Sequence, residues 1–513
     1  MLFRSPFVRF FSRILNRITI TVVLVALQLL WLCWVAFAIT TGTGRVWVNG
    51  LLNALSLLIV LYLVRKDENS AYKVGWIALI GILPLLGGAL YLAFGNKRPA
   101  KRLRLKMQAV EDAHKKDLVQ EPGVLEGLDA REQGQSRYVA KYGPYPAWQN
   151  TRTQYFACGE AMYPQLLADL EKAEKSIFLE FFIVSHGCMW NGIEKILRRK
   201  AAAGLDVRVI YDDAGCLSLL PHNYAELLRA EGIRAFSFNR CVPVLNLVMN
   251  NRDHRKIMVI DGRIGFTGGV NLADEYINRL VRFGYWKDSG VRLEGPGAGA
   301  LANIFLTFWK AQYPDEDIDI DRDLPAAAPV PTDCLVQPFA DTPVDREAVA
   351  KNVYLELINQ AQRRLQICTP YLILDNDLLA CLRLAAKRGV DVRIYTPGVP
   401  DKPTIYQLTR SYFPHLLRAG VRIFSYTPGF LHAKTWLVDD RIAAVGTVNL
   451  DYRSLYLHFE NSVLIYGGAV LDDVRRDLAE IEKESAEVKL ADCRTGFFGT
   501  MYSAVLRLVA PLC

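Results

Sequence analysis

Two segments of this chain repeat each other closely enough to determine its architecture. Residues 253–276 read DHRKIMVIDGRIGFTGGVNLADEY, and residues 431–454 read LHAKTWLVDDRIAAVGTVNLDYRS. In both, a histidine is followed by lysine at +2, aspartate at +7, glycine at +14 and asparagine at +17. Residues two apart on a strand share one face, and the aspartate falls where a tight hairpin turn is expected. The repeat therefore predicts two related domains, each with one histidine, lysine and asparagine.

The repeat extends beyond this hairpin and follows an alternating pattern. Residues 201–213 match 385–398. Apolar strand-like runs alternate with amphipathic helical runs from about Gln149, which is typical of α/β domains. A Pro-, Ala- and Asp-rich break separates the two halves. We therefore predict a first domain at 149–316, an inter-domain linker at 317–333, and a second domain at 334–513 that ends in an apolar tail.

The N-terminal region has a different character. Three runs without a formal charge, 18–39, 46–64 and 74–96, are each long enough to cross a hydrocarbon core of about 30 Å. They predict a transmembrane arm at 1–96 and a multi-pass protein of the cell (plasma or inner) membrane, followed by a charged juxtamembrane linker at 97–148. The third run contains Pro84 and several glycines, so it could kink or re-enter. The positive-inside rule and the basic residues after this run disagree on which side the catalytic domains face.

Charge and cysteine content exclude some classes of function. The net charge is +8, but residues 1–106 alone carry +12, which leaves the remainder at −4. The basic excess therefore suits anionic lipid headgroups, and a nucleic-acid partner is not indicated. The ten cysteines show no CxxC or Cys/His ligand spacing. We expect mostly buried free thiols, with no structural zinc site and no disulfide framework.

Two copies of histidine, lysine and asparagine suggest one chemistry if the domains face each other. They would form a pocket with two imidazoles, two ammonium groups and two amides, which suits a phosphodiester whose oxygens gain charge in the transition state. One imidazole can attack phosphorus, while the other protonates the leaving alcohol and deprotonates the incoming one. This scheme requires no metal and no cofactor.

The paired HRKIMVID and HAKTWLVD segments, with GGVN and GTVN downstream, resemble the HKD motifs of the phospholipase D superfamily. The segments SAYKVGW, TPYLILD and RLVAPL extend this resemblance to bacterial cardiolipin synthases, over about residues 50–513. The resemblance implies tandem α/β domains with pseudo-twofold symmetry. It also implies a phosphatidyltransferase that converts two phosphatidylglycerol molecules to cardiolipin and glycerol without a nucleotide.

The resemblance also implies roles for individual residues. His254 would be the nucleophile and His432 the general acid and base. Further residues would hold the phosphate oxygens (Lys256, Lys434, Asn271 and Asn449) or orient the histidine of the opposite half (Asp288 for His432 and Glu460 for His254). Asp261 and Asp439 complete the catalytic motifs, but their position at the hairpin bends favours a structural role.

Several alternatives stay open at this point. Glu180 and Tyr371 could line the pocket or pack in the core. Thr447 stands where a serine is expected, and its hydroxyl preserves the chemistry. The tail at 496–513 could be an interfacial helix or could complete the second domain. A membrane-bound phospholipase D would use the same residues with water as acceptor, and another transferase could use phosphatidylethanolamine as donor. A nuclease is disfavoured by charge, and an inactive scaffold by the intact motifs.

Overall fold

The computed structural model describes residues 45–512 except 67–68, 96–100, 115–119, 242–250, 317–326, 345–346 and 495, together with five isolated residues between 26 and 34. The first apolar run, 18–39, therefore lies almost entirely outside the described residues, as does most of the linker at 317–333.

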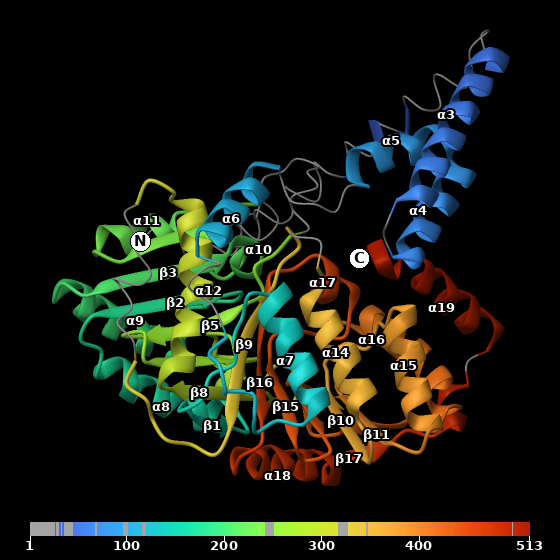
Figure 1. Cartoon of the computed structure of the whole chain (residues 1–513). Helices are drawn as coiled ribbons and strands as arrows, with labels where there is room; N and C mark the ends of the chain where they lie inside the picture. Colours follow the sequence, from blue (N-terminus) through green and yellow to red (C-terminus); the bar gives the residue numbers. More distant parts are fainter. Residues whose placement is uncertain are drawn as a thin grey trace, which may run out of the picture.

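Two β-sheets form the centre of the molecule (Figure 1). The first has the order β1-β8-β6-β5-β2-β3-β4, with strands β1 Arg152–Phe156, β2 Ser176–Phe181, β3 Asp206–Asp212, β4 Arg234–Phe238, β5 Lys256–Ile260, β6 Ile264–Gly268 and β8 Gly290–Glu294. The second has the order β17-β12-β11-β10-β14-β15-β16-β9, with strands β9 Leu335–Asp341, β10 Arg364–Cys368, β11 Asp391–Pro397, β12 Arg422–Tyr426, β14 Thr435–Val438, β15 Ile442–Gly446, β16 Glu460–Tyr466 and β17 Ser485–Glu487.

The two sheets have the same topology apart from the extra edge strand β17. In each, three parallel strands (β2-β3-β4 or β10-β11-β12) continue into the antiparallel hairpin of the repeated motif (β5-β6 or β14-β15). The duplication predicted from the sequence is therefore present strand by strand.

Helices cover the faces of both sheets. In the first domain they are α8 Gly159–Glu171, α9 Cys188–Ala202, α10 Asp213–Cys216, α11 Tyr224–Ala230, η2 Asp274–Ile277 and α12 Pro296–Gln312. In the second they are α14 Val349–Gln360, α15 Asn376–Lys387, α16 Pro403–Leu417, α17 Tyr452–Tyr456, α18 Val470–Lys483, η3 Leu490–Cys493, α19 Phe497–Val509 and η4 Ala510–Leu512. Two more, α6 Lys101–His114 and α7 Ala130–Tyr142, precede the first sheet.

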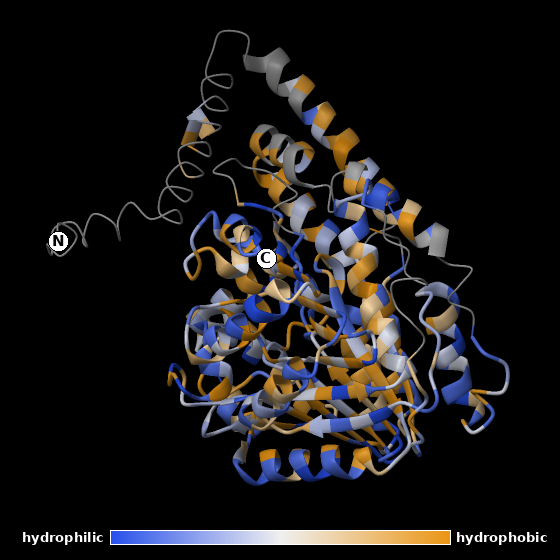
Figure 2. Cartoon of the chain, turned by 90° about the vertical axis from the view of Figure 1, so that its left-hand side faces the viewer, coloured by the Kyte–Doolittle hydropathy of each residue, from blue (hydrophilic) through white to orange (hydrophobic). Residues whose placement is uncertain are grey.

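The two domains share one hydrophobic core, visible as the apolar strands at the centre of Figure 2. Helix α12 lies in this core, and its Phe305 stacks on Phe178 of the first sheet at 5.0 Å. The same cluster contains Leu437 and Val463 of the second sheet. Because burial of apolar area is the main stabilising term, this shared core fixes the domains against each other. The nine described cysteines are all free thiols, but only four are buried, fewer than expected.

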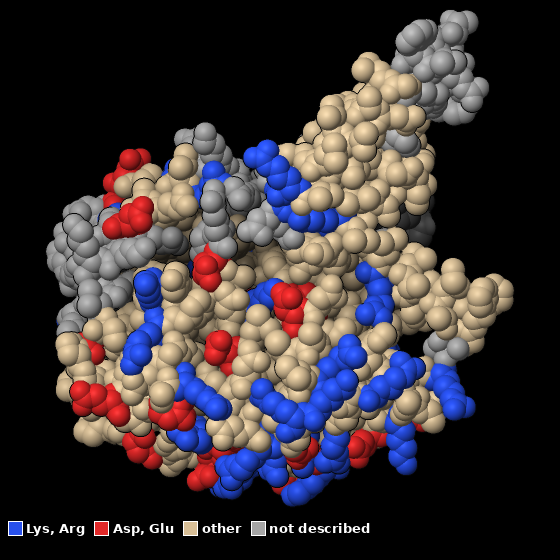
Figure 3. All heavy atoms as spheres, turned by 45° about the vertical axis from the view of Figure 1, so that its right-hand side comes forward, with Lys and Arg blue, Asp and Glu red and all other residues tan. Residues whose placement is uncertain are grey.

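The N-terminal arm consists of α3 Arg45–Arg65, α4 Ser70–Ile82 and α5 Pro84–Phe94, which project from the body that holds the two sheets (Figure 1). The third apolar run is not one helix, because it breaks at Leu83 and Pro84 begins α5. Helix α5 then returns along α4 so closely that a Cβ on Gly87 would lie 2.6 Å from the carbonyl oxygen of Leu79. Among the described helices, none has both the length and the apolar character needed to cross a bilayer, so the expected spans are not established. The described part of these helices carries few charged side chains on the face shown in Figure 3.

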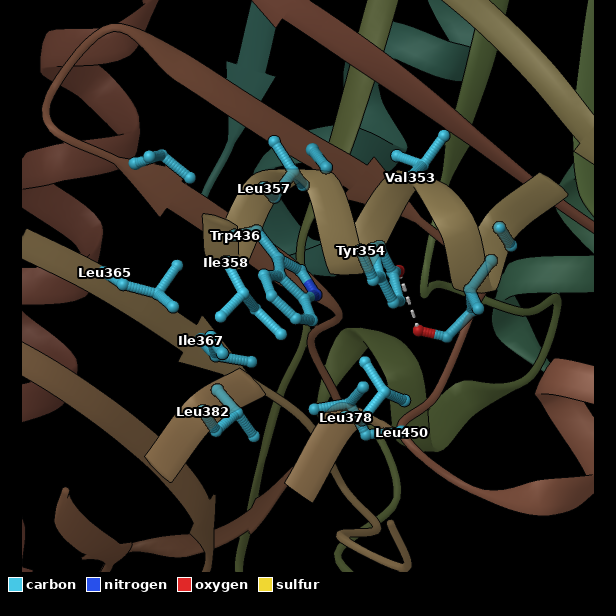
Figure 4. Packing of buried hydrophobic residues seen from close by; sticks show 14 of the residues in the cluster. Val353, Tyr354, Leu357, Ile358, Leu365, Ile367, Leu378, Leu382, Trp436 and Leu450 are labelled. Carbon is cyan, nitrogen blue, oxygen red and sulfur yellow. Dashed lines mark hydrogen bonds between the residues drawn. The ribbon is translucent and has the colours of Figure 1, made fainter. Parts of the chain in front are cut away.

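The core of the second domain positions part of the site. Val353, Tyr354 and Leu357 of α14 face the sheet, where Tyr354 stacks on Trp436 of β14 at 4.3 Å (Figure 4). The buried Tyr354 hydroxyl donates to the carbonyl oxygen of Val448 at 3.1 Å. This bond anchors the segment that carries Asn449.

Candidate active site

Backbone pairing between the domains places the two histidines. The short strand β7 (Tyr285–Lys287) of the first domain pairs with β13 (Gly429–Leu431) of the second. The His432 amide donates to the carbonyl oxygen of Lys287 at 2.7 Å, and the His254 amide donates to that of Phe459 at 2.9 Å. The backbone of each histidine is thus hydrogen-bonded to a residue of the opposite domain, and that residue directly precedes a carboxylate.

The side chains follow the same crossed arrangement. Nδ1 of His254 lies 2.9 Å from Oε2 of Glu460, and Nδ1 of His432 lies 2.7 Å from Oδ2 of Asp288. Both carboxylates are fully buried. A carboxylate that accepts from Nδ1–H fixes the tautomer and leaves the Nε2 lone pair for reaction. The structure therefore brings together the four residues in the pairs expected from the sequence.

Each motif lysine lies beside its histidine, as the strand period predicts. Lys256 Nζ donates to the His254 carbonyl oxygen at 2.7 Å, and Lys434 Nζ donates to that of His432 at 2.5 Å. Lys434 Nζ also lies 2.9 Å from both ring nitrogens of His432. Burial lowers the pKa of Lys256 to about 8 and that of Lys434 to about 7, because a low-dielectric site disfavours the ammonium.

The surroundings of both histidines favour the neutral imidazole. Burial, followed by the nearby Lys256, holds the pKa of His254 well below its usual value. Burial and Lys434 lower the pKa of His432 to about 4, against the opposing attraction of Asp288. Neutral His254 is the form that can attack phosphorus. His432 needs a proton to act as an acid, and an anionic phosphodiester in the pocket would raise its pKa.

The two asparagines differ in how they are held. Oδ1 of Asn271 accepts from the Ile183 amide at 3.0 Å, and its Nδ2 donates to the Tyr276 hydroxyl at 2.7 Å. Oδ1 of Asn449 is buried with no hydrogen-bond partner among the described residues. Both side chains line the pocket, and the carboxamide of Asn449 has fewer hydrogen-bond partners than that of Asn271.

A pocket of about 550 Å³ is lined by both histidines and both asparagines. The ring of Phe182 packs edge-on against that of His254, with 5.1 Å between the ring centroids. The rings of Tyr276 and Trp286 pack against His432, with centroid distances of 5.5 and 5.4 Å. Further apolar lining comes from Ile183, Phe283, Ile373, Ile405, Leu408, Phe430 and Ala510. The pocket thus combines apolar walls with convergent polar and charged groups, among them Arg252, Arg282 and Arg453, which is typical of a ligand-binding site.

Neither motif aspartate lies in the pocket. Asp261 accepts from the backbone N–H groups of residues 174–176, and Asp439 accepts from those of residues 362–364. Both adopt positive φ, 53° and 51°, at the hairpin turns. These contacts join each hairpin to the start of a parallel strand, which fits the structural role that their position at the bends favours.

The structure also distinguishes the remaining residues whose roles the sequence left open. Glu180 lies 2.6 Å from Arg255 in a buried ion pair and does not line the pocket, whereas Tyr371 does. The Thr447 hydroxyl donates to Glu460. At the equivalent place in the first domain, a Cβ on Gly269 would lie 2.0 Å from Oδ1 of Asp288. The GTVN and GGVN segments thus differ because each accommodates a different carboxylate.

Comparison with known proteins decides the family. The profile described as "Cardiolipin synthase, PLD-like domain" matches residues 166–281 and 354–481, and the "Phospholipase D-nuclease N-terminal" profile matches 52–96. A cardiolipin synthase of Alkalihalophilus pseudofirmus is 33% identical over 94% of this chain and 97% of its own length. The chain belongs to the cardiolipin synthase family.

Other relatives of this cardiolipin synthase family member agree. Cardiolipin synthase A of Pseudomonas putida strain GB-1 is 33% identical over 90% of this chain and 97% of its own length. An uncharacterized protein of Streptococcus mutans is 40% identical over 88% and 99% of the two chains. The solved phosphatidylserine synthase of Haemophilus influenzae shares the fold, with a TM-score of 0.57 at 17% identity, over 74% of this chain and 98% of that one.

His458 is a pocket residue that reasoning from the motifs missed. It lines the pocket, its ring lies 5.7 Å from that of His254, and it occupies the place of Trp286 two residues before the carboxylate. Alignment of WKDSG with HFENS within the repeat was the available signal. In the described part of this family member, the ligand atoms of His254, His458 and Glu460 lie within 4.8 Å of one another, so this group could hold a cation.

The lysine pKa values predict an alkaline limit on substrate capture. As pH rises through about 7 and 8, Lys434 and Lys256 lose the charge that attracts an anionic phosphodiester. The low pKa of His432 already makes kcat/KM for short-chain phosphatidylglycerol decline with rising pH below about pH 7, and we expect a steeper fall between about pH 7 and 9 as the lysines lose charge. kcat should fall at higher pH, because bound anion stabilises the ammonium groups. Steady-state profiles from pH 5 to 10 check this, and a flat kcat/KM up to pH 10 would contradict it.

Proposed function

We propose that this chain is a membrane-bound cardiolipin synthase that transfers a phosphatidyl group between two phosphatidylglycerol molecules through a phosphatidyl-histidine intermediate. The observation that carries this proposal is the crossed pair of histidine–carboxylate contacts that open on one pocket. Family membership supplies the lipid substrates, since the named relatives are cardiolipin synthases.

In the first half-reaction, Nε2 of His254 attacks phosphorus of the donor lipid. The P–O bond to the headgroup glycerol breaks as the P–N bond forms, and His432 donates its proton to the departing oxygen. Glycerol leaves, and the phosphatidyl group remains on His254. Glu460 stabilises the positive charge that develops on the attacking imidazole.

In the second half-reaction, a headgroup hydroxyl of another phosphatidylglycerol attacks the same phosphorus. His432, now neutral, takes the hydroxyl proton while the P–N bond to His254 breaks, and cardiolipin is released. Lys256, Lys434, Asn271 and Asn449 surround the phosphate and can stabilise its growing charge in both transition states. The cycle returns both histidines to their starting protonation states.

Product analysis tests this function. Purified protein in vesicles that contain headgroup-labelled and acyl-labelled phosphatidylglycerol should yield cardiolipin and free glycerol in equal amounts. Phosphatidic acid without cardiolipin would instead identify a hydrolase. Addition of labelled phosphatidylethanolamine tests the second alternative, because release of ethanolamine at a comparable rate would identify a different donor.

A chelator should not remove activity. The mechanism assigns every charge and proton to side chains of this chain, so EDTA at millimolar concentration is expected to change the rate of cardiolipin formation less than about twofold. The same assay after dialysis with and without added Mg²⁺, Mn²⁺ or Zn²⁺ measures this. Loss of activity on chelation that one metal restores would contradict the scheme and would point to the cation-capable group at His254.

We further propose that the N-terminal arm and α19 hold the enzyme at the lipid surface. Helix α3 exposes Leu51, Leu58 and Leu61, and α19 exposes Phe497 and Phe498 to 74% and 86%. The inner face of α19 is different, because Leu506 packs on the second-domain core and Ala510 of η4 reaches the pocket. Both interpretations of the tail therefore have support: one apolar face of α19 is buried against the second domain, and the other is exposed and available to a bilayer.

Polar substitution of the exposed face of α19 should weaken catalysis at membranes selectively. A triple variant, Phe497→Ser, Phe498→Ser and Val505→Ser, leaves the buried face intact. We expect at least a fivefold loss of rate on vesicles, from the lost apolar contact area, and little change on a soluble short-chain substrate. Vesicle co-sedimentation gives a second readout. Equal losses on both substrates would argue against membrane docking.

A further inference from the structure

A polar cluster in the second domain has no role in the mechanism above. The Tyr371 hydroxyl donates to Oδ2 of Asp401 at 2.7 Å and accepts from Nζ of Lys402 at 3.1 Å. Lys402 Nζ also lies 3.2 Å from Oδ2 of Asp401. All three side chains line the pocket that contains His254 and His432.

Packing does not account for this cluster. The Lys402 side chain is 62% exposed, so it contributes little to the core, while Asp401 is 16% exposed and opens on the pocket. Burial, followed by the charge of Asp401, raises the pKa of Tyr371 well above its usual value, so the phenol keeps its proton and orients the carboxylate.

The cluster also breaks the symmetry of the duplication. In the first domain, the connection after β3 forms α10, and its carboxylates bind backbone N–H groups: Asp212 those of Ala214 and Gly215, and Asp213 that of Cys241. The connection after β11 instead presents Asp401 and Lys402 to the pocket. The Tyr371–Asp401–Lys402 arrangement therefore has no counterpart at the corresponding described connection of the first domain, which suits a substrate that is handled by only one histidine.

Helix α16 adds to the positive character of this side. Lys402 is its N-cap residue, and Ile405 and Leu408 in its first two turns line the pocket. The 15-residue helix therefore begins at the pocket, and the unpaired N–H groups of its first turn favour an anion nearby. The Lys402 ammonium and the N-terminus of α16 thus lie beside the Asp401 carboxylate. Such a site can bind a ligand that carries both an anionic group and hydroxyl groups.

We propose that Asp401 and Lys402, held by Tyr371, bind the phosphoglycerol headgroup of the acceptor lipid. This inference rests on the proposed function. Lys402 and the start of α16 pair with the acceptor's own phosphate, which is distinct from the phosphate on His254, and Asp401 accepts from a glycerol hydroxyl. Binding at this subsite favours a lipid alcohol over water at His432 and so sets the ratio of transfer to hydrolysis.

An activated donor separates acceptor binding from formation of the intermediate. With a p-nitrophenyl ester of phosphatidic acid, nitrophenol release reports the first half-reaction, and the ratio of cardiolipin to phosphatidic acid reports the fate of the intermediate. At subsaturating phosphatidylglycerol, Lys402→Gln is expected to lower this ratio about tenfold, as loss of one charge-assisted contact implies. Lys483→Gln, at an exposed lysine on α18 outside the pocket, is the matched control and should keep the wild-type ratio.

Free glycerol as acceptor distinguishes the two side chains. Glycerol offers hydroxyl groups without phosphate, so Lys402→Gln should disfavour transfer to phosphatidylglycerol but not transfer to glycerol. Asp401→Asn should disfavour both acceptors. An unchanged ratio in Lys402→Gln, or an equal loss with both acceptors, would overturn the inference while leaving the proposed function in place. Absence of cardiolipin from the wild-type protein would overturn the proposed function, and this inference with it.

Discussion

His254→Ala is expected to abolish formation of the phosphatidyl-enzyme with every donor, whereas His432→Ala should still form it with an activated donor. Removal of a nucleophile eliminates the intermediate, with a loss of about 10⁴-fold or more. Removal of the acid penalises glycerol, a poor leaving group, by about 10²- to 10⁴-fold. Nitrophenolate leaves without a proton, so that penalty should largely disappear with the nitrophenyl ester.

Mass spectrometry of acid-quenched samples measures this asymmetry directly. With the nitrophenyl donor, His432→Ala should carry the phosphatidyl adduct on His254 and accumulate it, because deprotonation of the acceptor is also impaired. His254→Ala should carry none. An adduct on His432 in the wild-type protein or in His254→Ala would exchange the two roles and retain the two-histidine scheme. His415→Ala, at a histidine outside the pocket that contacts Arg507, is a suitable control.

The features that could be predicted from the sequence are those that occur in both copies of the repeat. The alternation of strands and helices, the hairpins with Asp261 and Asp439 at their turns, and the histidine–lysine faces all follow from local periodicity within the repeat. The crossed contacts of Asp288 and Glu460 are different in kind. The Asp288 contact depends on β7 pairing with β13, and the Glu460 contact depends on a bridge between Asp253 and Phe459. These segments lie 144 and 206 residues apart, so no local pattern encodes the contacts, and only resemblance to a family suggested them.

What the sequence did not predict lies outside the repeated positions. Lys402 and Asp401 fall in a connection where the two halves diverge, so comparison of the halves gave no reason to select them. His458 stands where the other half has Trp286, so the repeat marked its position but not its chemistry. For the third apolar run the sequence left two interpretations open, a helix that crosses the membrane or a segment that breaks, because hydropathy reports burial and not chain direction. In the structure this run has the break at Leu83. Its fold-back depends on the close packing of Gly87 on α4.

The crossed contacts lead to a second large effect. Each carboxylate variant should reproduce the defect of the histidine in the opposite half of the chain. Glu460→Gln removes the charge that stabilises the His254 imidazolium and can reverse the tautomer, which would place the proton on the attacking Nε2. By analogy with loss of the carboxylate in a catalytic triad, the rate should fall about 10³- to 10⁴-fold, with both phosphatidylglycerol and the nitrophenyl donor.

Asp288→Asn should behave differently, although it lies in the same half of the chain as the nucleophile. Its partner is His432, so its loss should be large with phosphatidylglycerol and small in nitrophenol release. Asp169→Asn, which breaks a buried ion pair with Arg292 outside the pocket, controls for the effect of removing a buried carboxylate. Pre-steady-state bursts of nitrophenol in the three variants give the comparison. If Glu460→Gln kept its burst and Asp288→Asn lost it, each carboxylate would serve the histidine of its own half, and the crossed geometry would not be the catalytic one.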